Sequence, residues 1–200
     1  MSTIIYVSTE TSSVWNYAKD APDETQPYLV RLSWLLDNPD GTTRRQGGGL
    51  VRMPVGERMP GPAAYATGIF DHNLATRGMK PLDMLAEFCE PLAEADLIVA
   101  HNWQTARKAI ECSLRRAGMQ AVVWPDVFDT HVQAKPILKI PLKRPEGGYR
   151  FPTNNETWQH FFGRTSQVSV DPVVDGFVKV RDIRAIFYAI KTLADREQVA

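Results

Sequence analysis

The residues of this chain that could do chemistry lie in three segments, 6–11, 99–106 and 177–185, far apart in the sequence. The first contains Glu10 and the third contains Asp182. Side chains alternate along a strand, so Ser8 and Glu10 point to the same side of the strand predicted at the N-terminus. Acids at both of these positions would place two carboxylates within reach of shared divalent cations. In phosphoryl-transfer enzymes such cations activate water and stabilise the transition state.

Each of these residues also has a simpler interpretation. Glu10 alone is typical of a surface acid at the end of a strand, and Asp182 of an acid in the first turn of a helix, where the helix dipole favours it. Asn102 could be the N-cap of the helix that follows it. The order and spacing of the three segments decide between the interpretations.

The three segments resemble, in order, the motifs of the DnaQ-like, DEDDh family of 3′–5′ exonucleases, which read roughly D-x-E-T, A-H-N-x-x-F-D and H-x-x-x-x-D-x-R-A. This chain reads S-T-E-T, A-H-N-W-Q-T-A and F-V-K-V-R-D-I-R-A at these places. The resemblance implies that Glu10 and Asp182 remain from four metal-binding acids. It puts Ser8 and Ala106 where the other two aspartates belong, and Phe177 where the general-base histidine belongs.

These replacements predict that catalysis is absent or severely impaired. Ser8 offers a neutral hydroxyl, Ala106 offers no ligand, and Phe177 cannot accept a proton. Loss of a general base alone typically costs about 10²–10⁴ in rate. We therefore expect Glu10 and Asp182 to bind one metal ion weakly or none, no cofactor, and Mg²⁺ or Mn²⁺ only with residual activity.

The resemblance extends over most of the chain and implies its fold. Stretches 93–102, 128–130, 139–152 and 161–163 are similar to further parts of the family pattern. The family has an α/β, ribonuclease H-like fold, with a mixed central sheet flanked by helices. A length of 200 residues fits a single domain, 1–200.

Hydrophobic patterning predicts the elements of that fold. Strands are expected at 4–7, 28–36, 42–53, 97–100 and 121–124, with glycines 47–49 bulging or weakening the third. Helices are expected at 81–95, 105–117 and 181–195. Pro91 would kink or end the first helix, and Gly118 would stop the second.

Composition limits the classes of function. Lys and Arg number 23, as do Asp and Glu, and this zero net charge argues against a wholly cationic nucleic-acid binder. No apolar run reaches membrane-spanning length, and the N-terminus does not resemble a signal peptide. Cys89 and Cys112 have no C-x-x-C spacing and are interpreted as reduced thiols of a cytoplasmic protein.

A basic strip between residues 135 and 150 could follow a phosphate backbone, although a solvated loop explains it equally well. The candidate nucleic-acid-binding residues are His101, Asn102, Lys139, Lys143, Arg144 and Arg150.

Three functions stay open: a silent domain that binds a single-stranded 3′ end, a module that binds a replication, repair or phage-host protein, and an active exonuclease with a rebuilt site. Asp175 is one acid that could help to rebuild such a site.

Overall fold

The central sheet of the molecule is mixed, as the sequence predicts. The structure is a computed structural model that describes residues 2–18, 23–143 and 147–199, with side chains described as far as residue 196. The strands are β1 Ile4–Thr11, β2 Leu29–Asp37, β3 Thr43–Leu50, β4 Leu97–Ala100 and β5 Asp126–Asp129, in the order β3-β2-β1-β4-β5. β1 to β3 pair antiparallel, whereas β4 and β5 run parallel to β1.

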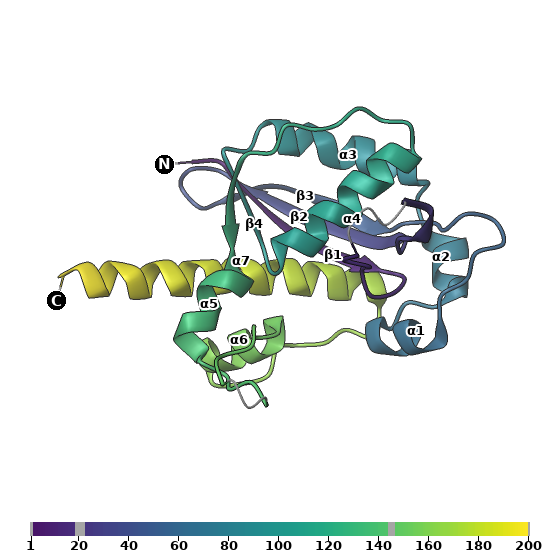
Figure 1. Cartoon of the computed structure of the whole chain (residues 1–200). Coiled ribbons are helices and arrows are strands. Elements are labelled where there is room, and N and C mark those ends of the chain that lie inside the picture. Colours follow the sequence, from purple (N-terminus) through teal and green to yellow (C-terminus); the bar gives the residue numbers. More distant parts are fainter. Residues whose placement is uncertain (1, 19–22, 144–146, 200) are drawn as a thin grey trace.

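Helices cover both faces of this sheet (Figure 1). They are α1 Gly61–Thr67, α2 Asp71–Arg77, α3 Pro81–Ala93, α4 Trp103–Arg116, α5 Thr130–Leu138, α6 Asn154–Phe162 and α7 Pro172–Val199, with a short 3₁₀ turn at Asp23–Thr25. Alternation along β1 explains the two layers: Ile5 and Val7 pack under α3 and α4, whereas Tyr6 packs against Val180 and Phe187 of α7. No helix in the described ranges is long and apolar enough to cross a membrane.

Three predicted elements are wrong in extent or place. Residues 121–124 are not a strand, because the fifth strand begins at Asp126 and Trp124 instead packs edge-on against Trp103, with 4.9 Å between ring centroids. The last helix begins at Pro172 rather than at 181, so Asp182 lies in its interior and not in its first turn. Pro91 stands inside α3, which continues to Ala93.

The glycines of β3 form no bulge. Gly47 pairs with Trp34 and Gly48 with Ser33 in an uninterrupted register. A Cβ at Gly47 would lie 2.4 Å from the Trp34 ring and 2.5 Å from the Glu87 carboxylate, so the missing side chain gives room to both. The Gly118 stop is confirmed: α4 ends at Arg116, and Gly118 has a φ of 68°.

Candidate functional site

The carboxyl end of β1 borders a small cavity of about 140 Å³, here called the Glu10 cavity. Ser8, Glu10, His101 and Ala106 all line it, so the structure brings together residues from the first two motif segments. Lys179 and Ile183 of α7 and Asn154 of α6 complete the wall. Parallel pairing of β1 with β4 explains the meeting, because the two strands end at the same edge of the sheet.

The Glu10 carboxylate is already held by two cations of the chain. Its Oε1 lies 3.1 Å from Arg31 Nη2 and 2.8 Å from Lys179 Nζ. Arg31 also binds Asp175 at 2.9 Å, and Lys179 Nζ lies 3.6 Å from the same carboxylate. Two acids and two bases therefore form one neutral network, here called the Arg31 network, that ties β1 and β2 to α7.

The central residue of the Arg31 network is fully buried. Arg31 is 0% exposed and additionally donates from Nη1 to the Pro172 carbonyl at 2.8 Å. A buried guanidinium is costly unless its charge is paired, so its acids are held to it. The sequence signal was one arginine in the apolar strand Leu29–Asp37, because charged residues are rarely buried without a partner.

Asp182 forms no ion pair with the described residues of this network, although it interacts electrostatically with Asp175 and Lys179, and it faces a larger cavity. This cavity, of about 770 Å³, is here called the α1–α7 cavity, and Asp175, Lys179 and Asp182 of α7 line one side of it. Ser166 donates a hydrogen bond to the Asp182 carboxylate. Burial raises the pKa of Asp182 to about 6, while the Ser166 hydrogen bond opposes the rise.

The residues present do not fit a pair of divalent metal ions. Ser8 and Ala106 supply no charge, and the Glu10 oxygen that faces Arg31 and Lys179 is shared by both cations. Asp182 lines the larger cavity instead of the Glu10 cavity. In the described residues, no three His, Cys, Asp or Glu side chains group closely enough to hold a metal. Protein cations thus neutralise Glu10, one of the two acids expected to bind a metal.

Phe177 lies in α7 and is not among the described residues that line the Glu10 cavity. The early start of α7 places residue 177 within the helix, where positions five apart differ by about 140° around the axis. Phe177 lines neither the Glu10 cavity nor the α1–α7 cavity formed by the described residues. The assignment of residue 177 to the general-base position therefore stays a prediction from the resemblance.

His101 and Asn102 have structural roles beside the cavity. His101 Nε2 donates to the Pro152 carbonyl and Nδ1 lies near Thr130 Oγ1, both at 3.0 Å, and burial lowers the pKa of His101 to about 4. Asn102 is the N-cap of α4, with a φ of 68°, and its side chain accepts from Thr105 N at 3.4 Å. The simpler interpretation of Asn102 is confirmed.

Asp129 belongs to the stretch 128–130 that resembles the family pattern, and it has a capping role beside this site. Its carboxylate accepts from the backbone N–H of Asn102 at 3.0 Å and of Trp103 at 2.9 Å, and also from His131 N at 3.0 Å. One acid therefore caps the starts of α4 and α5 together, which fixes the wall of the Glu10 cavity.

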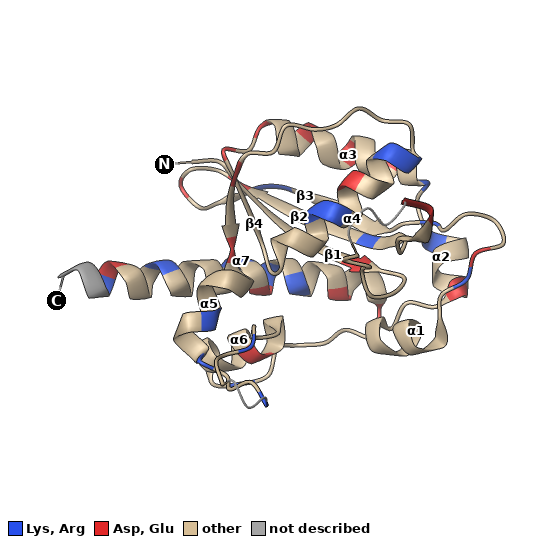
Figure 2. Cartoon of the chain, viewed as in Figure 1, with Lys and Arg blue, Asp and Glu red and all other residues tan. Residues whose placement is uncertain are grey.

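The basic strip is only partly available to a ligand. Lys139 and Lys143 are exposed, whereas Arg150 binds Glu156, with one contact of 2.9 Å, and lowers the pKa of that acid to about 2. Arg144 lies outside the described residues. Acidic and basic residues are interspersed on the view of the molecule in Figure 2, in keeping with the zero net charge.

Two aromatic residues, Tyr65 and Phe70, line the α1–α7 cavity on the side formed by residues 65–70. Tyr65 of α1 is 82% exposed, and its ring meets that of Phe70 edge-on at 5.8 Å. Asn154 and Lys179 line both this cavity and the Glu10 cavity, so the two are neighbours. No motif pointed to Tyr65.

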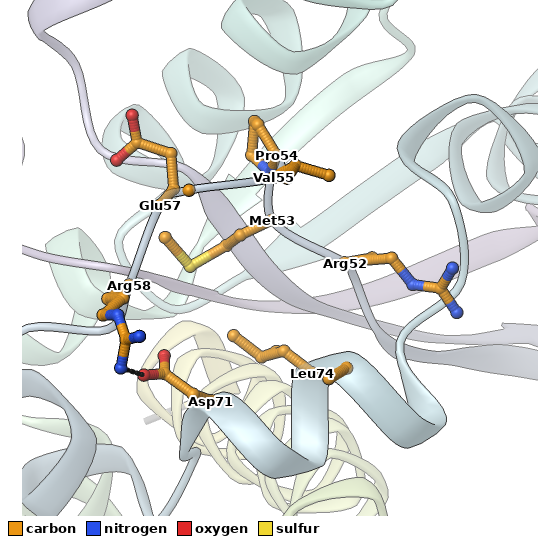
Figure 3. Close-up of a pocket in the computed structure, with 10 residues that line it drawn as sticks. Arg52, Met53, Pro54, Val55, Glu57, Arg58, Asp71 and Leu74 are labelled. Atoms are coloured by element: carbon orange, nitrogen blue, oxygen red, sulfur yellow. Dashed lines mark ion pairs between the residues drawn. The ribbon is translucent and has the colours of Figure 1, made fainter.

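A further cavity of about 400 Å³ lies between residues 52–58 and α2. Figure 3 shows Arg58 reaching Asp71 across it, with 4.0 Å between the charged atoms. Asp71 also accepts from Met59 N at 2.8 Å, which fixes the loop above α2. This cavity shares no lining residue with the Glu10 cavity.

Comparison with known proteins gives structural but no sequence matches. No protein-family model and no curated protein matches the chain. Exonuclease I of E. coli in complex with a dT13 oligonucleotide is similar over 98% of this chain and 42% of its own, with 14% identity and a TM-score of 0.71. The ExoI/SSB-Ct complex matches over 98% of this chain and 42% of its own, with 12% identity and a TM-score of 0.68.

A 3′-exonuclease that recognises the 3′ end of a histone mRNA stem-loop is similar over 96% of this chain and 82% of its own, with 12% identity and a TM-score of 0.62. The chain spans less than half the length of the exonuclease I structures that it matches. At such low identity the likeness concerns the fold. The chain has the ribonuclease H-like, mixed α/β fold of these exonucleases.

Proposed function

We propose that this protein is a DnaQ-like 3′–5′ exonuclease homologue that has lost cleavage and binds the 3′ end of a single-stranded nucleic acid. The observation that carries the proposal is the pairing of Glu10 with Arg31 and Lys179 at 3.1 and 2.8 Å. An acid held by two protein cations has little left to offer a metal ion, and no described group replaces the general base. The fold is kept while the metal-dependent chemistry is lost.

The α1–α7 cavity is the proposed place for the strand end. Tyr65 and Phe70 offer exposed rings for stacking on bases, and Lys179 offers a positive charge where this cavity meets the Glu10 cavity. Structures with this fold include exonuclease I with a dT13 oligonucleotide and a 3′-exonuclease on a histone mRNA stem-loop. Both of these proteins have nucleic-acid ligands, which supports the proposed ligand class.

A protein-interaction module is the second candidate. Zero net charge favours it over a strongly electrostatic nucleic-acid binder, and one of the similar structures is an ExoI/SSB-Ct complex. An active exonuclease with a rebuilt site is the third, and Asp175 does lie beside Glu10. Arg31 bridges these two acids, however, so Asp175 is neutralised together with Glu10.

The test is a nuclease assay and a binding assay on the same protein. With Mg²⁺ or Mn²⁺ we expect a 5′-labelled single-stranded oligonucleotide to stay intact, and its fluorescence anisotropy to rise on binding, less so at higher salt. Tyr65→Ser should weaken binding by about 1–3 kcal/mol, the usual value of a stacked base. Tyr188→Ser, an exposed aromatic change on α7 that lines neither cavity, is the matched control and should bind normally.

Two results would redirect the proposal. Progressive 3′ trimming that Glu10→Ala abolishes would establish the active exonuclease. No binding at low salt, by a protein shown to be folded, would leave the interaction module.

A further inference from the structure

A second site of quite different character lies between α3 and α4, here called the α3–α4 pocket. Its volume is about 350 Å³, within the size range of ligand pockets. It is formed by the start of β2, the end of β3, the start of α3 and the end of α4. Its apolar lining residues are Tyr28, Leu29, Val51, Pro54, Pro81, Leu82 and Ala117.

All charged residues described in the wall of this pocket are cations: Arg52, Lys80 and Arg116. The other charged cavities differ, because Glu57 and Asp71 line the cavity of Figure 3, and acids line both the Glu10 cavity and the α1–α7 cavity. In a molecule with no net charge, an apolar pocket with a purely basic rim is a local asymmetry. It complements an acidic ligand.

The backbone holds two of these cations together. Arg52 N donates to the Met79 carbonyl at 2.8 Å, and Met79 N donates to the Leu50 carbonyl at 2.9 Å, so residues 52 and 80 belong to neighbouring chain segments. Gly78 permits this approach, because a Cβ there would lie 2.3 Å from the Leu74 carbonyl oxygen and 2.9 Å from Arg52 N.

The side chains of Arg52 and Lys80 are free to meet a ligand. Both are exposed, and neither forms an ion pair with the described residues. Figure 3 shows Arg52 directed away from the Arg58–Asp71 pair. Arg116, by contrast, is fixed: it donates to the carbonyls of Pro27 and Gln26 at 3.2 and 2.7 Å and lies over the Tyr28 ring at 4.4 Å.

We propose that the α3–α4 pocket docks an acidic peptide segment of another protein, which inserts one bulky apolar side chain. The inserted side chain would cover Leu29, Val51 and Ala117, and the flanking carboxylates would meet Arg52 and Lys80. Burial of an apolar anchor supplies affinity, and the basic rim selects acidic neighbours. This site is separate from the proposed nucleic-acid site, with which it shares no lining residue.

The chemistry favours a peptide over a nucleic-acid strand. A strand needs cations along a groove together with exposed rings for base stacking. Here the pocket is enclosed mainly by aliphatic side chains and prolines, and Leu82 at its edge is 52% exposed. Such a surface is suited to a single apolar anchor.

The probe is a fluorescein-labelled short peptide in which one Trp is flanked by Asp and Glu, followed by anisotropy with the full chain. We expect saturable binding that Arg52→Glu/Lys80→Glu weakens by at least about tenfold, since two attractive charges become repulsive. The matched control is Arg181→Glu/Lys191→Glu, which makes the same change of charge at two exposed positions of α7. It should bind the peptide like the unmodified protein, and both variants should unfold normally in urea.

Three outcomes would overturn the proposal. They are equal binding of a peptide in which Ser replaces Trp, equal loss in both double variants, and no binding of the acidic peptide at low salt. Displacement of the peptide by an oligonucleotide, with loss of oligonucleotide binding in Arg52→Glu/Lys80→Glu, would assign the pocket to nucleic acid instead. Oligonucleotide binding that depends on Tyr65 is measured separately, so either proposal can fail alone.

Discussion

Arg31 replaces by its own charge what a metal ion would otherwise provide to the acids around it. Its guanidinium lies between Glu10 of β1 and Asp175 of α7, and Lys179 lies next to both acids. Since carboxylates brought together without a cation repel each other, the site needs positive charge in some form. Here that charge is covalently part of the chain.

Removing this charge should cost far more than breaking a surface ion pair. We expect Arg31→Met to lower the free energy of unfolding by about 3–5 kcal/mol, because Glu10 and the buried Asp175 then lose their shared buried partner and keep only Lys179. The measurement is urea denaturation at neutral pH. Arg107→Met is the control: its pair with Glu111 is exposed at 2.8 Å and should contribute about 0–1 kcal/mol. Equal losses in the two variants would refute the importance of the Arg31 network.

Asp182 gives a prediction about pH. Its pKa is raised by burial from 3.8 to about 6, so between these values the folded protein retains a proton that the unfolded chain releases. The stability contributed by Asp182 is therefore present at low pH and is lost as pH rises through about 4 to 6. Residue 182 cannot ionise in Asp182→Asn. As pH rises through this window, the free energy of unfolding of the variant should therefore increase relative to that of the unmodified protein.

Urea denaturation of both proteins at several pH values between 4 and 7 measures this difference. His101 also titrates in this window, with its pKa lowered by burial, and it makes stability rise with pH. Because both proteins contain His101, its contribution cancels in the difference. Curves that stay parallel across the window would contradict a raised pKa at Asp182.

Motif positions could be found from the sequence, but their partners could not. Ser8, Glu10 and Ala106 meet at one cavity, as their order along the chain implied. Arg31 belongs to no motif and Lys179 stands at an unspecified position of the third motif, so only the fold brings them to Glu10. Phe177 and Asp182 lie in one helix, which their spacing in the sequence alone did not show.

Helix α7 positions most of the site, and its close approach to the sheet depends on one glycine. A Cβ at Gly176 would lie 2.3 Å from Ser33 Oγ and 3.0 Å from Arg31 Cδ. The first turns of α7 can therefore bring Asp175 and Lys179 to β1 and β2 only because residue 176 has no side chain. Glycine costs stability in a helix in general, so its place here reflects packing.

Gly176→Ala should accordingly destabilise the protein, although alanine is the better helix former. We expect a loss of about 1–3 kcal/mol from overpacking against β2, measured by thermal or urea unfolding. Gly61→Ala is the matched change in α1, where nothing lies within 4 Å of the added Cβ, and it should be neutral or slightly stabilising. A neutral Gly176→Ala would show that α7 can shift without cost.

Elements with a strong local pattern were predictable, and those set by tertiary packing were not. Strands near 28–36 and 97–100 and the helix from Pro81 agree with the structure within a few residues. The segment 121–124 is apolar enough for a strand, but Trp124 is bound by Glu111 at 3.0 Å and packed on Trp103. Helices α1, α2, α5 and α6 were not predicted, since they are short and get their stability from the core.

For the molecule as a whole, the topology followed from the sequence because local pattern and motif order agree. An antiparallel meander followed by β-α units allows few arrangements, and the motif order selects one of them. What the sequence could not show is charge distribution in space. Equal numbers of acids and bases conceal a neutral, internally paired site at one place and an all-basic apolar pocket at another.

The contact between Trp103 and Trp124 has a practical use. Their rings stand nearly perpendicular, at 80°, at a centroid separation short enough for the excited states of the two indoles to couple. One ring belongs to the first residue of α4, and the other to the connection that leads into β5. Circular dichroism in the indole bands would therefore serve as an optical reporter of whether that connection stays docked, without any attached label.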